Sequence, residues 1–167
     1  MDLPKRKHPR LKDYDYSQDG LYFITICTHG KKHIFSTIDI TGDLENSQVQ
    51  LTEAGIIAEN HLVLLEERYK NANIITSVIM PNHIHFILAI ENKESASPHS
   101  VQDMVCAYKS LVAKECKKRL GIEKLFQVSF YDHIIKNEKD FENTVLYIER
   151  NPARWIYDKY YSDGTFC

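Results

Sequence analysis

The sequence ANIITSVIMPNHIHFILAI, residues 72–90, contains two apolar runs separated by a short turn. Residues 72–79 and 83–90 each have the β-branched and apolar composition of a strand, and Met80-Pro81-Asn82 interrupts them as one tight connection. Residues i and i+2 of a strand lie on one face, so His83 and His85 point to the same side while Ile84 turns into the core. The stretch therefore predicts two strands, the second of which presents two imidazoles together.

The remaining chain alternates between helical and extended patterns. The first half of the chain predicts a strand at 21–28, a short extended piece at 49–51 and a helix from Glu53 to about Tyr69. Thr52 is the expected N-cap of this helix, and Ile57, Leu64 and Leu65 lie at helical spacing within it. The second half predicts a polar loop at 91–100, a helix that starts at a capping box of Ser100 and Asp103, an extended or irregular piece at 125–135, and a helix at 138–150. This order predicts an α+β sandwich, with helices packed against one face of a mainly antiparallel sheet.

Length and composition favour a single compact unit. With 167 residues and 43% hydrophobic content, we expect one domain over residues 1–167 with a basic N-terminal tail at about 1–13. The first residues lack the apolar stretch of a signal peptide, and no apolar run is long enough to span a membrane. We therefore expect a cytoplasmic protein without membrane contact. The four scattered cysteines are interpreted as reduced thiols.

Positive charge is clustered although the net charge is −2, which argues against a protein that coats duplex DNA by bulk electrostatics. One cluster lies in the N-terminal tail and the other closes the helix that begins after Ser100. The candidate phosphate contacts are Lys5, Arg6, Lys7, Arg10, Lys117 and Lys118. The alternative is a solvated tail and cations that complement a helix C-terminus.

A His-x-His triplet alone is weak evidence for a metal site, because two histidines also occur together on a solvated strand. The longer string at residues 80–87, Met-Pro-Asn-His-Ile-His-Phe-Ile, resembles the signature of the HUH superfamily, in which one hydrophobic residue separates two histidines. More narrowly, the chain resembles REP-associated tyrosine transposases, relatives of the single-tyrosine transposases of insertion sequences. Three further stretches carry this resemblance in the same order: Tyr14-Asp15-Tyr16 with the strand at 22–28, residues 126–135, and residues 147–152. Relatives often have Trp where this chain has Phe126.

The resemblance implies a ferredoxin-like sheet in which His83 and His85 hold a divalent ion, Mg²⁺ or Mn²⁺. It also implies that a tyrosine on a nearby helix cleaves and rejoins single-stranded or hairpin DNA, such as palindromic repeats, through a 5′-phosphotyrosine intermediate. The phenol needs such help, since its pKa near 10 makes it a poor nucleophile at neutral pH. Members of the superfamily act as monomers or homodimers, and both states remain open here.

Matching the family's C-terminal pattern places the nucleophile at Tyr147. At about 100° per residue, Phe141, Val145 and Ile148 form the apolar stripe of that helix, while Tyr147 and Asn151 share its flank. The resemblance implies that Asn151 supplies an oxygen ligand to the ion, and the alternative is a helix-terminating Asn before a proline.

Other residues and other functions compete with this interpretation. Tyr108 follows the polar loop, but it lies within the apolar stripe of its helix and is interpreted as a core residue. His133 is expected to touch DNA, to orient a metal ligand, or to be a structural hydrogen-bonded histidine. The alternative functions are a domesticated protein that binds DNA hairpins without cleaving them, and a metal-dependent hydrolase that uses His83, His85 and His133.

Overall fold

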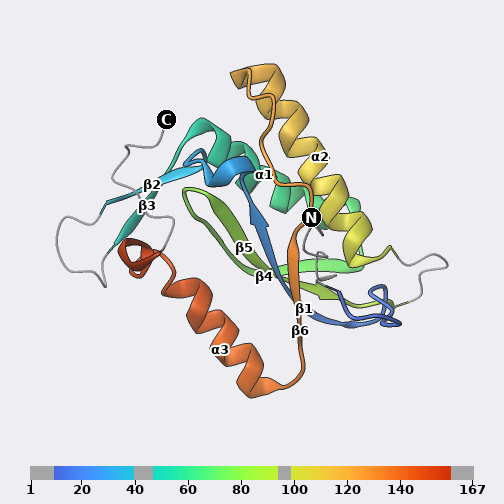
Figure 1. Ribbon diagram of the computed structural model, residues 1–167. Coiled ribbons are helices and arrows are strands. Elements are labelled where there is room, and N and C mark those ends of the chain that lie inside the picture. The colour runs from blue at the N-terminus through green and yellow to red at the C-terminus, as the bar shows by residue number, and fades with distance from the viewer. Residues whose placement is uncertain (1–9, 40–46, 94–98, 159–167) are drawn as a thin grey trace, which may run out of the picture.

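The computed structural model describes residues 10–39, 47–93 and 99–158 (Figure 1). The elements in chain order are β1 (Gly20–Cys27), the 3-10 turn η1 (His29–Lys31), β2 (Ser36–Asp39), β3 (Gln48–Leu51), α1 (Glu53–Arg68), β4 (Ala72–Ile79), β5 (His83–Ile90), α2 (Val101–Leu120), β6 (Tyr131–Ile135), α3 (Glu138–Glu149) and the 3-10 turn η3 (Trp155–Tyr157). No helix within the described ranges is both long and apolar enough to cross a membrane.

The main sheet has four strands in the order β4-β5-β1-β6, and each neighbouring pair is antiparallel. Together with α1 and α2 the strands follow the order β1-α1-β4-β5-α2-β6, which is the ferredoxin-like arrangement. The predicted α+β sandwich is therefore confirmed. β5 and β1 occupy the centre of the sheet, so β5 has a hydrogen-bonded strand on both sides.

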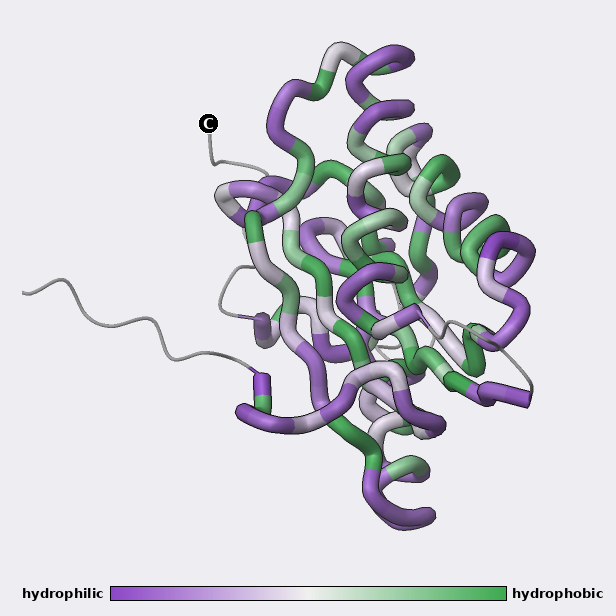
Figure 2. Tube along the Cα trace, turned by 90° about the vertical axis from the view of Figure 1, so that its right-hand side faces the viewer, coloured by the Kyte–Doolittle hydropathy of each residue, from purple (hydrophilic) through white to green (hydrophobic). Residues whose placement is uncertain are grey.

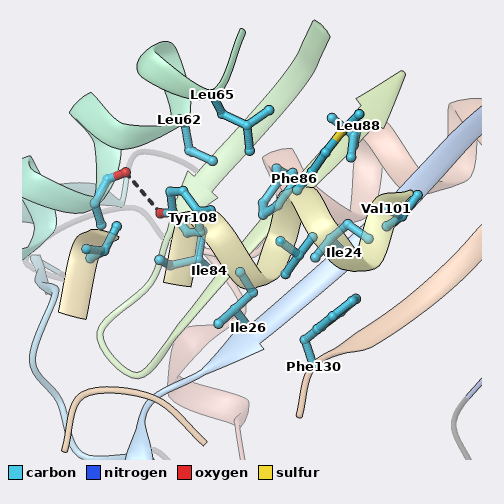
Figure 3. Packing of buried hydrophobic residues seen from close by; sticks show 14 of the residues in the cluster. Ile24, Ile26, Leu62, Leu65, Ile84, Phe86, Leu88, Val101, Tyr108 and Phe130 are labelled. Atoms are coloured by element: carbon cyan, nitrogen blue, oxygen red, sulfur yellow. Dashed lines mark hydrogen bonds between the residues drawn. The ribbon is translucent and has the colours of Figure 1, made fainter. Parts of the chain in front are cut away.

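One face of the sheet is covered by α1 and α2 (Figure 1). Alternate residues of β5 point into this layer, where Ile84, Phe86 and Leu88 are fully buried (Figure 3). Tyr108 of α2 belongs to the same core, and its hydroxyl donates a hydrogen bond of 2.9 Å to the Ala58 carbonyl of α1. The interpretation of Tyr108 as a core residue is confirmed, because its ring is closed off from solvent.

The third helix, α3, packs on the opposite face of the sheet (Figure 1). Ile148 of α3 is buried against Ile87 of β5 and Ile135 of β6, with Phe141 and Val145 beside them. The expectation of helices on one face thus holds for α1 and α2 and needs this correction for α3. The physical reason is that the sheet carries apolar side chains on both faces, and the second set needs its own cover.

Helix boundaries follow the local signals closely. Thr52 caps α1 by accepting from the Gly55 N–H, and Ser100 with Asp103 forms the predicted capping box of α2. Along both helices, hydrophobic and hydrophilic residues alternate with the turn of the helix (Figure 2). One prediction for the buried face of α1 was wrong. Leu64 is 47% exposed, whereas Ile57 and Leu65 are buried.

A two-stranded ribbon of β2 and β3 stands apart from the main sheet. The extended piece at 49–51 is confirmed as part of β3, but β2 was missed because residues 29–47 are polar and turn-rich. The helix after the ribbon starts in close contact with the residue before β2, since a Cβ added to Gly55 would clash with the Phe35 carbonyl oxygen. Glycine is therefore required where α1 approaches this segment.

Candidate active site

His83 and His85 lie at the start of β5 and point to the α3 face of the sheet, with ring centroids 4.5 Å apart. Both side chains are buried, while Ile84 between them belongs to the other face. The alternation of the strand therefore places the two imidazoles together, as the spacing predicted.

The turn before the histidines is fixed by a distant part of the chain. The Pro81 carbonyl accepts hydrogen bonds from the N–H groups of Ile34 and Phe35, at 2.8 and 3.1 Å, and the Asn82 carbonyl accepts from the Thr28 N–H at 2.9 Å. These bonds join the turn to the segment between β1 and β2. The backbone just before the histidine pair is consequently buried and held by hydrogen bonds.

His83 contacts two amide oxygens. Its Nδ1 is 2.6 Å from Asn82 Oδ1, and its Nε2 is 3.2 Å from Asn151 Oδ1. Burial lowers the pKa of His83 to about 4, although the Asn151 contact and the charge of Asp158 favour protonation and Lys31 opposes it. The ring is therefore neutral at pH 7, with one N–H and one lone pair.

His85 has polar contacts with β1, through the Thr25 side chain and the Ile24 backbone. Its Nδ1 lies 2.8 Å from Thr25 Oγ1 on the neighbouring strand β1, and the register of β1 and β5 places these residues directly opposite each other. Burial, with the nearby His83 and Lys31, holds the pKa of His85 well below its usual range. Its Nε2 is buried and has no hydrogen-bond partner within the described part of the chain.

Tyr147 lies on the flank of α3 and contacts His85. The ring centroids of Tyr147 and His85 are 5.3 Å apart, and Phe23 of β1 packs edge-on against the same tyrosine at 5.9 Å. Tyr147 is 44% exposed, whereas the next residue, Ile148, is buried. The phenol thus sits beside the histidines and is open to a large substrate, which is the position predicted for a nucleophile.

Asn151 lies just after the end of α3, one helical turn beyond Tyr147, and its Oδ1 points at His83. It is buried, and its backbone N–H donates to the Ile148 carbonyl at 3.2 Å. The structure therefore brings all four predicted residues, His83, His85, Tyr147 and Asn151, into one cluster, while their roles in catalysis and metal binding stay predictions.

The donor set suits a cation. Lone pairs on His83 Nε2 and Asn151 Oδ1 would face each other if the His83 hydrogen is on Nδ1, and the partnerless His85 Nε2 adds a further nitrogen. Within the described residues, no group of three or more His, Cys, Asp or Glu side chains has metal-site geometry. A metal held here would consequently need the Asn151 amide and ligands from outside the protein.

His133 lies on β6, on the same face as Phe23 and His85. Its Nε2 is 3.0 Å from both carboxylate oxygens of Asp140 at the start of α3. This contact agrees with the structural, hydrogen-bonded role, and it joins His133 to Asp140 rather than to the histidine pair. The side chain is half exposed, and its contact with DNA stays a prediction.

The structure describes three of the six predicted basic contacts, Arg10, Lys117 and Lys118. Lys5, Arg6 and Lys7 lie outside the described residues. Arg10 pairs with Asp132 at 3.5 Å and covers the Phe130 ring. Lys117 and Lys118 lie on α2, which packs against the face opposite to the histidines, and Lys117 pairs with Glu123 at 2.8 Å. Of the predicted cations that the structure describes, Lys117 and Lys118 therefore lie away from the histidine pair, and Arg10 is paired with Asp132.

Several residues of this cluster were missed by sequence reasoning. Thr25 holds His85 from β1, Asn82 holds His83, and Trp155 of η3 packs 6.3 Å from the His83 ring. Asn82 is adjacent to His83 and could have been considered as its partner. Thr25 and Trp155 carry no local signal, because only the strand register and the return of the chain after α3 bring them here.

The described chain also contains a cavity of about 410 Å³ between α1 and α2, lined by residues such as His61, Leu65 and Leu111. It lies on the α1 and α2 side of the sheet, so it is separate from the histidine cluster.

Comparison with known proteins gives a consistent picture. No protein-family model matches the chain. The chain is 29% identical to an uncharacterized protein of Haemophilus influenzae, over 95% of this chain and 94% of the relative. It is 26% identical to the REP-associated tyrosine transposase of Escherichia coli K12, over 75% of this chain and 72% of the relative.

Among solved structures, a REP-associated tyrosine transposase bound to a REP hairpin superposes with a TM-score of 0.62 and 19% identity, over 90% of this chain and 76% of that one. At this identity the superposition shows the shared fold alone. The sequence similarity to the transposase of Escherichia coli supports a transposase-like function. The resemblance that the motifs indicated is thus confirmed, and this chain is similar in sequence and fold to REP-associated tyrosine transposases.

Proposed function

We propose that this protein cleaves and rejoins single-stranded or hairpin DNA through a covalent link to Tyr147. The observation that carries the proposal is the contact between an exposed tyrosine and a buried histidine pair, in a chain similar to tyrosine transposases. A phenol in this place can reach a phosphodiester outside the protein while its ring edge is held by His85 and Phe23.

The proposed reaction conserves the phosphodiester energy. Tyr147 Oη forms a bond to the phosphorus, the bond from phosphorus to the 3′ oxygen breaks, and the phenolic proton passes to that oxygen. The products are a 5′-phosphotyrosine link and a free 3′-hydroxyl. Attack by a 3′-hydroxyl of another end reverses the step, restores the phenol and joins the strands, so no water is consumed.

His83 Nε2, His85 Nε2 and Asn151 Oδ1 would hold a Mg²⁺ or Mn²⁺ ion, with a substrate phosphate oxygen to complete the ligands. Such an ion stabilises a phenolate and polarises the phosphate that it contacts. The chain's own contribution is to keep both imidazoles neutral by burial and to fix their rings through Asn82 and Thr25. Neutral imidazoles are the form that binds a metal.

The choice of hairpin DNA rests on the solved relative, whose structure contains a REP hairpin. It is supported by the exposure of Tyr147, because a folded nucleic acid cannot enter a closed pocket. We propose no base sequence for the hairpin, since specificity depends on contacts with bases.

The test uses the full chain, Mn²⁺ and a hairpin oligonucleotide labelled at its 3′ end, so that the covalently bound fragment keeps the label. We expect a labelled band at the protein's mass under denaturing conditions, lost in Tyr147→Phe and on chelation of the metal. The matched control is Tyr157→Phe, because Tyr157 is an exposed tyrosine on the turn η3 and should not affect the band.

Other outcomes separate the alternatives. Hairpin binding without any adduct would mean that the protein recognises hairpins and does not cleave them. DNA hydrolysis that persists in Tyr147→Phe would favour a metal-dependent hydrolase and remove Tyr147 from the reaction.

A further inference from the structure

Asn82 is a buried polar side chain that supplies no ligand in the proposed reaction and acts only on the His83 ring. It is fully buried, and its backbone lies in the turn between β4 and β5, where its carbonyl accepts the Thr28 N–H. Its Oδ1 makes the shortest polar contact of the histidine pair, 2.6 Å to His83 Nδ1, while its Nδ2 has no partner within the described residues. Within the described residues, the side-chain amide of Asn82 therefore makes one hydrogen bond, to His83.

This contact determines where His83 carries its hydrogen. A neutral imidazole has one N–H, and an amide oxygen only accepts hydrogen bonds. Each ring nitrogen of His83 contacts an amide oxygen. Nδ1 is 2.6 Å from Asn82 Oδ1 and Nε2 is 3.2 Å from Asn151 Oδ1, so the Nδ1 contact is shorter by 0.6 Å. The hydrogen therefore belongs on Nδ1, which leaves the Nε2 lone pair directed at Asn151.

We propose that Asn82 is a positioning residue that holds His83 in its Nδ1–H tautomer, so that the Nε2 lone pair and Asn151 Oδ1 converge as ligands for a divalent cation. The value of this tautomer for metal binding rests on the proposed function. The tautomer itself is a property of the metal-free protein.

The neighbouring ring follows the same pattern. Thr25 Oγ1 lies 2.8 Å from His85 Nδ1, and His85 Nε2 is the nitrogen without a described partner. In both rings, a polar side chain, from the turn before β5 or from β1, contacts Nδ1 and leaves Nε2 for another ligand. Because Thr25 can donate as well as accept, Asn82 gives the sharper test.

The first experiment reads the tautomer by long-range ¹H–¹⁵N NMR of metal-free protein with ¹⁵N-labelled histidine at neutral pH. We expect His83 to show a protonated Nδ1 and an unprotonated Nε2 in the wild type. Finding the hydrogen on Nε2 instead would overturn the proposal, whatever the protein does to DNA.

The second experiment measures Mn²⁺ affinity through quenching of Trp155, which is the only tryptophan in the chain and lies 6.3 Å from the His83 ring. We expect Asn82→Ala to weaken Mn²⁺ binding roughly 10- to 100-fold, as removal of a ligand's hydrogen-bond partner does elsewhere. Asn82→Asp should restore it, because a carboxylate also accepts from Nδ1–H.

Asn71→Ala is the matched control. Asn71 is also a hydrogen-bonded asparagine next to β4, but it contacts Asn92 at the far end of the hairpin and should leave Mn²⁺ affinity unchanged. Equal Mn²⁺ affinity in wild type and Asn82→Ala would overturn the proposal. If the wild type binds no Mn²⁺, the proposed metal-dependent function fails, and the NMR result still decides the role of Asn82. If Asn82→Ala does not fold, the wild-type tautomer and Asn82→Asp remain as tests.

Discussion

The two faces of the central strand β5 differ in what their side chains contribute. On the side of α1 and α2, Ile84, Phe86 and Leu88 are fully buried in an apolar core. On the side of α3, His83 and His85 are also buried, but their contacts are polar and burial lowers their pKa values. The same strand therefore stabilises the fold on one face and holds two neutral imidazoles on the other. Burying these polar rings lowers the free energy of unfolding relative to an apolar face.

The largest expected difference between the faces is in the free energy of unfolding. Phe86→Ala should lower it by about 3–5 kcal/mol, because the substitution leaves a cavity in a core that cannot easily close. Tyr147→Phe removes one hydroxyl from a half-exposed ring and should change it by less than about 0.5 kcal/mol. Urea unfolding followed by circular dichroism measures both. A Tyr147→Phe variant as unstable as Phe86→Ala would contradict the division between the two faces.

A smaller effect should appear when pH is lowered. The unfolded chain protonates His83 near its ordinary pKa of 6.5, but the folded protein does so only near 4. Below pH 6.5 the unfolded state therefore binds the extra proton first, and the free energy of unfolding falls until about pH 4. The shift corresponds to about 3 kcal/mol for this group.

The measurement compares metal-free wild type with His83→Gln by urea unfolding between pH 7.5 and about 4.5. We expect the variant to lose less stability over this range, since it lacks the group that titrates. Identical pH dependence in the two proteins would mean that His83 is not held neutral by burial. His85 shifts in the same direction, so some pH dependence should remain in the variant.

The smallest expected effect is that of the basic end of α2. Lys117→Ala breaks an exposed ion pair with Glu123 and should change the free energy of unfolding by less than about 0.5 kcal/mol. Hairpin DNA bound at the histidine face should also keep its affinity, because α2 packs on the other side of the sheet.

Lys31→Gln provides the comparison on the histidine side. The charge of Lys31 acts on both His83 and His85, so its loss should weaken hairpin binding. Fluorescence anisotropy with a labelled hairpin measures both variants. A greater loss of affinity in Lys117→Ala than in Lys31→Gln would mean that DNA is bound along α2.

Local sequence was sufficient for much of the framework. The capping signals at Thr52 and Ser100, and the two strand runs at 72–79 and 83–90, coincide with observed element boundaries. The spacing of His83 and His85 also determines that they share a face, since side chains alternate in any strand. In the same way, the helical period of about 100° per residue placed Tyr147 beside the apolar stripe of α3.

Tertiary structure decided what those residues meet. Thr25 lies opposite His85 only because β1 pairs with β5 in one register, across 60 residues of sequence. Asn151 reaches His83 only because α3 covers the second face of the sheet, where the sequence had predicted helices on one face. Periodicity defines which side of an element a residue occupies, but contact between elements depends on how distant apolar surfaces pack, and that information is not contained in any local stretch of this chain.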